Sequence, residues 1–210
     1  MKIAIIILTI LFSSTSYSYV DLNLSYTYSL KRIEGVETVD NDDPGEAVST
    51  SNGASITWAW YIWQYTALEL NYGETTERLK DSRESTTSDE SVTIKNLDST
   101  LITKVSGVGI RQSFAGRKSS IIPSLSLGYA KYTTSGKTVY TLDIESEGEQ
   151  EITLEREQKS FNSYYAAFSL KFRITQLMGL TLAAKTVLQD LDADKPSDNV
   201  TYSAGLSWVF

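Results

Sequence analysis

The chain has 210 residues, with 26 acidic against 19 basic side chains and neither histidine nor cysteine. That length suits one domain, and the acidic balance argues against nucleic acid as a partner, because nucleic-acid binding needs a basic face. The missing cysteines exclude disulfides and thiolate nucleophiles, and the missing histidines exclude a Ser-His-Asp triad. We therefore expect no catalytic residues, no metal site, no cofactor and no enzymatic activity.

Residues 1–18 have the pattern of an export signal. Lys2 provides a positive start, residues 3–12 form a ten-residue apolar run, and residues 13–18 are small and mostly polar. Ten apolar residues are too few for a membrane-spanning helix, which needs about 20. We expect cleavage after Ser18, which leaves residues 19–210 as the exported protein.

The exported part alternates between apolar and polar side chains nearly throughout. Residues 19–30 contain six consecutive repeats, from Val20 to Leu30. Seven further segments follow the same pattern, near residues 56–60, 68–73, 107–111, 124–129, 164–173, 180–185 and 200–210. A period of two is typical of β-strands with one apolar and one polar face.

The connections between these segments are alternately short and long. Three are short, near residues 61–65, 115–120 and 174–178, and four are long, at about 31–53, 79–98, 133–160 and 189–198. This layout predicts an all-β fold, an antiparallel up-and-down transmembrane β-barrel of eight strands. Bulky rings on the apolar face suit lipid, and small polar residues suit a narrow lumen. Residues 139–155 predict a hairpin above the membrane, with two more strands and a ten-stranded barrel as the alternative.

Aromatic residues recur at a spacing that fits a membrane. An apolar band of about 25 Å corresponds to roughly ten residues of a tilted strand, so rings at its two borders should lie eight to ten residues apart. Tyr202 and Phe210 are eight apart, as are Tyr164 and Phe172. The aromatic girdle at the short-turn end is predicted to contain Trp60, Trp63, Phe172, Trp208 and Phe210.

The last strand carries a family resemblance. Residues 199–210 end in phenylalanine and place an outward-facing residue at every second position: Tyr202, Ala204, Leu206, Trp208 and Phe210. This pattern resembles the sorting signal that the outer-membrane assembly machinery reads. Together with the export signal and the eight strands, it makes residues 19–210 similar to the small eight-stranded outer-membrane proteins of the OmpA/OmpX-like superfamily. The resemblance implies location in the bacterial outer membrane, contact with its lipid and lipopolysaccharide, and a structural or surface role.

The charges separate along the chain. The four long loops hold 9 Lys+Arg against 22 Asp+Glu, whereas the rest of residues 19–210 holds 9 against 4. The loops should therefore present an acidic cell surface. Asp40, Asp42 and Asp43 form one acidic run and Asp190, Asp192 and Asp194 another, but Lys195 stands where a calcium loop requires glycine. We expect bridging cations near lipopolysaccharide rather than a dedicated metal site.

A few ionisable residues fall on the inward face of the predicted strands. They are Asp21, Glu69, Arg111, Lys171, Arg173 and Lys185. Buried charges must pair, so we expect a lumen network in which Glu69 meets Arg111, with Lys171 as a further partner. Counting from the short turns places Glu69 and Arg111 within one residue of the same height. The network would act as a plug that fills the core, or as a gate.

Three classes of function compete. A structural or surface-interaction barrel would use its acidic loops to contact an unknown surface partner. A small porin-like pore or transporter is the alternative, although an eight-stranded lumen is normally filled by side chains. A membrane enzyme is disfavoured, because barrel hydrolases and acyltransferases resemble one another in their dependence on histidine.

Overall fold

The computed structural model describes residues 19–34, 46–82, 85–86, 92–144, 148–188 and 200–210. The runs Asp40 to Asp43 and Asp190 to Asp194 and the expected export signal lie outside these residues. Strands make up nearly all of the described chain: β1 Tyr19–Glu34, β2 Glu46–Tyr61, β3 Thr66–Asp81, β4 Ser85–Thr86, β5 Val92–Ser113, β6 Ile121–Ile144, β7 Gly148–Arg173, β8 Met178–Leu188 and β9 Val200–Val209. No helix within these ranges has the length and apolar character needed to cross a membrane.

Eight of these strands form a closed antiparallel ring. Each long strand pairs with the next in the chain, β3 pairs directly with β5, and β1 pairs with β9 to close the ring. The two-residue β4 pairs with β5 alone. The predicted eight-stranded up-and-down architecture is confirmed. The ten-stranded alternative is wrong, because β6 and β7 each run uninterrupted through the hairpin that would have supplied the extra strands.

The barrel wall separates side chains as the alternation predicts. On β3, Leu68 and Leu70 are 44% and 58% exposed, whereas Glu69 between them is only 4% exposed. On β5, Val108 and Ile110 are both 57% exposed, whereas Arg111 is 9% exposed. A surface of large apolar side chains is unfavourable in water and favourable against lipid. The polar set therefore forms the core of this protein.

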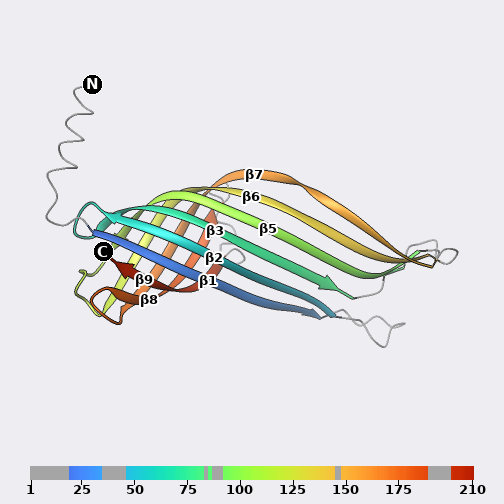
Figure 1. Ribbon diagram of the computed structural model, residues 1–210, viewed down its shortest axis with the longest axis horizontal. Helices are drawn as coiled ribbons and strands as arrows, with labels where there is room; N and C mark the ends of the chain where they lie inside the picture. Colours follow the sequence, from blue (N-terminus) through green and yellow to red (C-terminus); the bar gives the residue numbers. More distant parts are fainter. Residues whose placement is uncertain (1–18, 35–45, 83–84, 87–91, 145–147, 189–199) are drawn as a thin grey trace, which may run out of the picture.

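Six strands continue past the level at which the ring closes. β9 pairs with β1 only up to Tyr26, and β8 pairs with β7 only from Tyr164. Strands β1, β2, β3, β5, β6 and β7 extend further, as Figure 1 shows for β5, β6 and β7 beyond the ends of β8 and β9. The strands consequently occupy much of the ranges expected as loops, including 46–53, 92–98, 133–144 and 148–160.

A bulge changes which face of β7 is apolar. Thr134 pairs with Lys159 but Gly136 pairs with Arg156, so β7 has one extra residue there. An extra residue shifts the alternation by one position. Below the bulge, Tyr164 lies on the outer surface. Above the bulge, Leu154 pairs with Thr138, whose buried side chain is on the lumen side, so Leu154 is on the lumen side as well.

Two glycines make room for the largest fully buried side chain. Tyr165 is 2% exposed, and its ring lies against Gly128 while its hydroxyl lies against Gly109. A Cβ added at Gly128 would meet Tyr165 Cε1 and Cζ and the Val108 carbonyl oxygen. The backbone must therefore approach the ring more closely than a residue with a side chain allows.

Gly128→Ala should lower the free energy of unfolding by about 1–3 kcal/mol, because the added methyl group overpacks the lumen. Urea titration of the protein in one fixed detergent or lipid measures the change. The matched control is Gly116→Ala, whose added Cβ would lie 3.9 Å from Tyr65 and should change stability by less than about 0.5 kcal/mol. Equal losses in the two variants would contradict the packing argument.

Candidate functional site

The inward face of the barrel brings Glu69 and Arg111 into direct contact. Arg111 Nε donates to Glu69 Oε2 at 2.7 Å, and Ser126 Oγ donates to the same oxygen at 2.9 Å. Asn71 Nδ2 donates to the other oxygen, Oε1, at 2.9 Å. Both oxygens of this buried carboxylate thus have hydrogen-bond donors, which offsets much of the cost of removing its charge from water.

The strand register differs from the prediction that Glu69 and Arg111 lie within one residue of the same height. Arg111 lies opposite Ala67 and Glu69 lies opposite Gly109, so the two charged residues are diagonal neighbours two positions apart. Counting from turns could not find this offset, because strand register depends on where the turn hydrogen bonds fall. A diagonal separation is within reach of a long side chain such as arginine.

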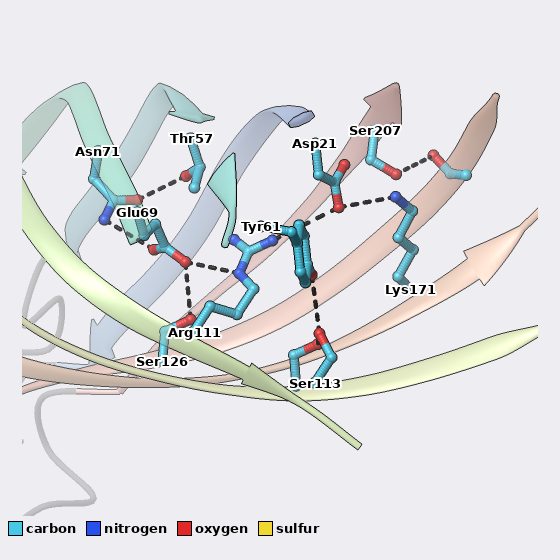
Figure 2. A network of polar contacts seen from close by, with 12 residues as sticks. Asp21, Thr57, Tyr61, Glu69, Asn71, Arg111, Ser113, Ser126, Lys171 and Ser207 are labelled. Atoms are coloured by element: carbon cyan, nitrogen blue, oxygen red, sulfur yellow. Dashed lines mark hydrogen bonds and ion pairs between the residues drawn. The ribbon is translucent and has the colours of Figure 1, made fainter. Parts of the chain in front are cut away.

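Asp21 and Lys171 extend the network across the lumen. Lys171 Nζ donates to Asp21 Oδ2 at 2.9 Å, and Arg111 NH1 lies 3.8 Å from the same oxygen. Figure 2 shows Arg111 between Glu69 on one side and Asp21 on the other. Lys171 therefore joins the network through Asp21 rather than through Glu69. Two carboxylates face two cations, so this four-residue network, which we call the lumen plug, carries no net charge.

The other two predicted lumen cations lie apart from the plug. Lys185 Nζ sits 4.3 Å from the centre of the Tyr165 ring, a cation–π contact. Arg173 lies at the short-turn end, where its NH1 donates to the backbone oxygen of Arg117 at 3.2 Å. Neither has a side-chain carboxylate within salt-bridge distance among the residues that the structure describes.

Neutral residues support the plug in ways that the sequence analysis missed. Asn71 Nδ2 also donates to the Tyr165 hydroxyl at 2.6 Å, and Thr57 Oγ1 donates to Asn71 Oδ1 at 2.8 Å. Asn71 and Thr57 could have been suspected, since both fall on the polar side of their strands. The inward position of Tyr165 breaks the small-residue pattern and becomes understandable only beside Gly109 and Gly128.

The plug lies between two cavities. A cavity of about 380 Å³ on the side of the long hairpins is lined by Glu69, Asn71, Arg111, Tyr165 and Lys185, among others. A cavity of about 20 Å³ at the short-turn end is lined by Asp21, Arg111, Lys171 and Arg173 among others. Arg111 contributes to both, so its side chain separates a large polar vestibule from a space that holds about one water molecule.

The predicted girdle residues lie on the outer surface near the short turns. Trp60, Trp63 and Phe210 are 44%, 59% and 72% exposed, and Phe172 and Trp208 are half-buried.

The predicted assembly residues Tyr202, Ala204 and Leu206 are also exposed, on the outer face of β9. Ser207, between Leu206 and Trp208, is 1% exposed and donates to the Gly179 carbonyl at 3.2 Å. Assembly by this pattern stays a prediction.

Within the described ranges no three Asp or Glu side chains gather as potential metal ligands. The acidic runs around Asp42 and Asp192 fall outside those ranges. The inward carboxylates Asp21 and Glu69 both have cationic partners instead.

No protein-family model matches the chain, and neither does any curated protein. Among solved structures it is similar to the N-terminal β-barrel domain of Pseudomonas aeruginosa OprF, with 11% identity, a TM-score of 0.48, and coverage of 92% of this chain and 98% of that one. It is also similar to the attachment invasion locus protein Ail of Yersinia pestis in complex with the heparin analogue sucrose octasulfate, with 13% identity, a TM-score of 0.47, and coverage of 92% and 99%. Neisserial surface protein A matches with 10% identity, a TM-score of 0.36, and coverage of 91% and 94%.

These similarities are too distant to carry an activity to this chain. The strand arrangement itself is the stronger observation, since eight antiparallel strands follow one another around a closed ring. This is the architecture of the small outer-membrane β-barrels of the OmpA/OmpX-like type. The resemblance expected from the sequence is thus confirmed at the level of the fold.

Glu69→Ala should lower the free energy of unfolding by about 3–5 kcal/mol, because it leaves Arg111 buried without its nearest carboxylate. Asp21, 3.8 Å from Arg111 NH1, will soften the loss. Glu69→Ala combined with Arg111→Ala should recover part of it, because that lone cation is then gone. A double-mutant cycle from urea titrations measures the coupling energy.

Glu74 and Lys104 provide a matched control on the same two strands. Their Nζ–Oε2 distance is 3.8 Å, and their side chains are 49% and 56% exposed. An exposed pair contributes at most about 1 kcal/mol, so Glu74→Ala should have little effect. A coupling energy near zero between Glu69 and Arg111 would show that the plug does not hold together in the folded protein.

Phe210→Asp should impair assembly of the barrel into membranes if the terminal pattern is a sorting signal. Phe114→Asp is the matched control, because Phe114 is 62% exposed at the same end of the barrel but lies outside the last strand. The fraction of folded protein, read from the shift in electrophoretic mobility on heating, measures assembly. Equal impairment in both variants would indicate a general cost of charge near lipid and would contradict a specific signal.

Proposed function

We propose that the protein is an integral outer-membrane β-barrel with a structural or surface-interaction role. The apolar outer wall supports the membrane location, since Leu70, Val108 and Ile110 are each more than half exposed and would be unfavourable in water. The aromatic residues near the short turns suit the membrane border. Export through residues 1–18 is part of the proposal. The barrel would contact lipid, lipopolysaccharide and the assembly machinery.

The observation that carries the surface role is the projecting sheet, formed where β5, β6 and β7 continue beyond the ring. Every residue of β7 from 148 to 162 is exposed, although it is paired with β6. A barrel that only anchored itself or filled the membrane would gain nothing from strands of this length. Exposed elements held on a rigid scaffold are where binding functions concentrate.

The outer face of β7 in the projecting sheet is acidic, and Lys137 of β6 lies opposite Glu155. Above the β7 bulge, Glu149, Glu151 and Glu155 alternate on the face opposite Leu154. Lys95 Nζ lies 2.9 Å from Asp143 and 3.1 Å from Glu149, so it balances part of this charge, and its hydrogen bonds to Asp143 and Glu149 raise the pKa of Lys95. The proposed surface partner is therefore one with a basic face. Long-range attraction of this kind weakens with salt.

A pore or transporter is the second candidate, and the vestibule of about 380 Å³ favours it. The lumen plug argues against a pore or transporter, because Arg111 lies between Glu69 and Asp21 across the lumen. We expect no steady conductance from the intact protein in planar bilayers. Steady openings in the intact protein would favour the pore over the surface role.

The surface role is tested by shortening the hairpin without touching the barrel. Thr138 and Leu154 are register partners, so residues 139–153 can be replaced by Asn-Gly, a two-residue turn. Cells displaying the full chain should bind immobilised cationic proteins such as lysozyme better than cells displaying the shortened chain. Acidic albumin serves as the control surface, and heat-dependent mobility checks that both barrels are folded.

Equal binding by the two cell populations would contradict the surface role. Binding to lysozyme that is insensitive to salt would contradict the electrostatic part of the proposal, because attraction between exposed charges is screened.

A further inference from the structure

The mouth of the barrel at the short-turn end holds two guanidinium groups without counter-ions. Arg117 lies in the turn between β5 and β6, and Arg173 is the last residue of β7. Both line the cavity of about 20 Å³, together with Lys171 and Gln176. The short turns at this end, residues 62–65, 114–120 and 174–177, contain no aspartate or glutamate.

The acidic side chains inside the barrel do not balance the positive charges of Arg117 and Arg173. Glu69 pairs with Arg111 at 2.7 Å, and Asp21 pairs with Lys171 at 2.9 Å. Those two carboxylates are the only acidic side chains on the lumen side near the plug in the described chain, and both are used. No described side-chain carboxylate lies within 4.0 Å of Arg117 or Arg173.

Contacts from other elements hold the two arginines over the mouth. The Arg117 guanidinium carbon lies 5.0 Å from the centre of the Tyr19 ring, and that ring stacks on Tyr61 at 4.1 Å. Tyr61 is in turn hydrogen-bonded to Ser113 at 2.9 Å. Arg173 NH1 donates to the Arg117 carbonyl oxygen at 3.2 Å, which fastens the end of β7 to this turn.

Two guanidinium groups that line one cavity suit an oxyanion, and Arg117 is exposed to the surroundings. The planar fork of arginine donates two parallel hydrogen bonds to a carboxylate or phosphate group, and its charge cannot be removed by deprotonation. The cavity beneath has room for about one water molecule, so an anionic group can place one oxygen there while the rest of its molecule remains outside. Asp21 lies deeper in this cavity, and Lys171 neutralises its charge.

We propose that Arg117 and Arg173 form a binding site for a phosphate or carboxylate group at the short-turn mouth of the barrel. The group belongs either to a phospholipid of the adjacent leaflet or to a soluble anion on that side of the membrane. The site lies at the opposite end from the acidic projecting sheet, so it is independent of the surface role proposed above.

The test begins with isothermal titration of inorganic phosphate into the folded full chain in a neutral detergent, at constant ionic strength. Saturable binding is expected, and Arg117→Gln combined with Arg173→Gln should weaken it at least tenfold. Lys118→Gln is the matched control, since Lys118 adjoins Arg117 in the same turn but does not line the cavity. It should change the affinity less than twofold. Heat-dependent mobility confirms that each variant is folded.

A second arm identifies the source of the anion. The protein is placed in nanodiscs of phosphatidylcholine with or without phosphatidylglycerol, and the lipids that remain bound are counted by native mass spectrometry. Retention of phosphatidylglycerol by the intact protein but not by the double variant assigns a lipid phosphate. Equal retention by both, with phosphate binding still lost in the double variant, assigns a soluble anion.

Two results would overturn the proposal. One is the absence of saturable phosphate binding together with equal phosphatidylglycerol retention by the intact protein and the double variant. The other is an equal loss of affinity in Lys118→Gln and in the double variant, which would mean that the positive charge of the turn acts diffusely without a defined site.

Discussion

Closure of the sheet is the constraint on which the rest of this structure depends. The pairing of β1 with β9 gives both strands a hydrogen-bonding partner on each side, and a membrane demands this because lipid offers no alternative. Closing only eight strands makes the lumen narrow. Small residues must then line most of it, and the most deeply buried ring of the described residues, Tyr165, is accommodated because Gly109 and Gly128 carry no side chain.

The narrow lumen also decides how charge is handled. Glu69, Arg111, Asp21 and Lys171 are all at most 9% exposed, and an unpaired charge at any of these positions would be costly. The four side chains form a neutral chain of alternating sign, and Ser126 and Asn71 satisfy the remaining capacity of the Glu69 carboxylate. The two ends of the barrel are less constrained, and their charges differ in sign. Arg117 and Arg173 face one end, while the acidic face of the projecting sheet lies at the other.

Beyond the level of closure, the same strands form the projecting sheet proposed to meet a partner. The bulge opposite Ser135 shifts the alternation of β7, so that the apolar side chains that face lipid lower down give way to glutamates on the outer surface. The shift keeps Ile152 and Leu154 off the outer face, although both are exposed on the lumen side, at 43% and 53%. The outer face of β7 is already polar at Asn162 and Ser160, so the bulge lies within the part of the strand proposed to meet a partner.

The sequence by itself determined the up-and-down strand order and the inward set of residues below the β7 bulge, because a period of two assigns each side chain to a face whatever its partner is. It left eight and ten strands open, and the uninterrupted pairing of β6 with β7 decided for eight. It also placed Glu69 and Arg111 on neighbouring strands. It could not place Arg111 opposite Ala67 or give Lys171 to Asp21, since Asp21 and Lys171 are 150 residues apart and meet only across the closed lumen. The alternation also puts Tyr165 inward, but its contacts with Gly109 and Gly128 and the length of the projecting strands were decided by tertiary structure. Both depend on register and bulges, which are set by hydrogen bonds between distant segments and leave little trace in local composition.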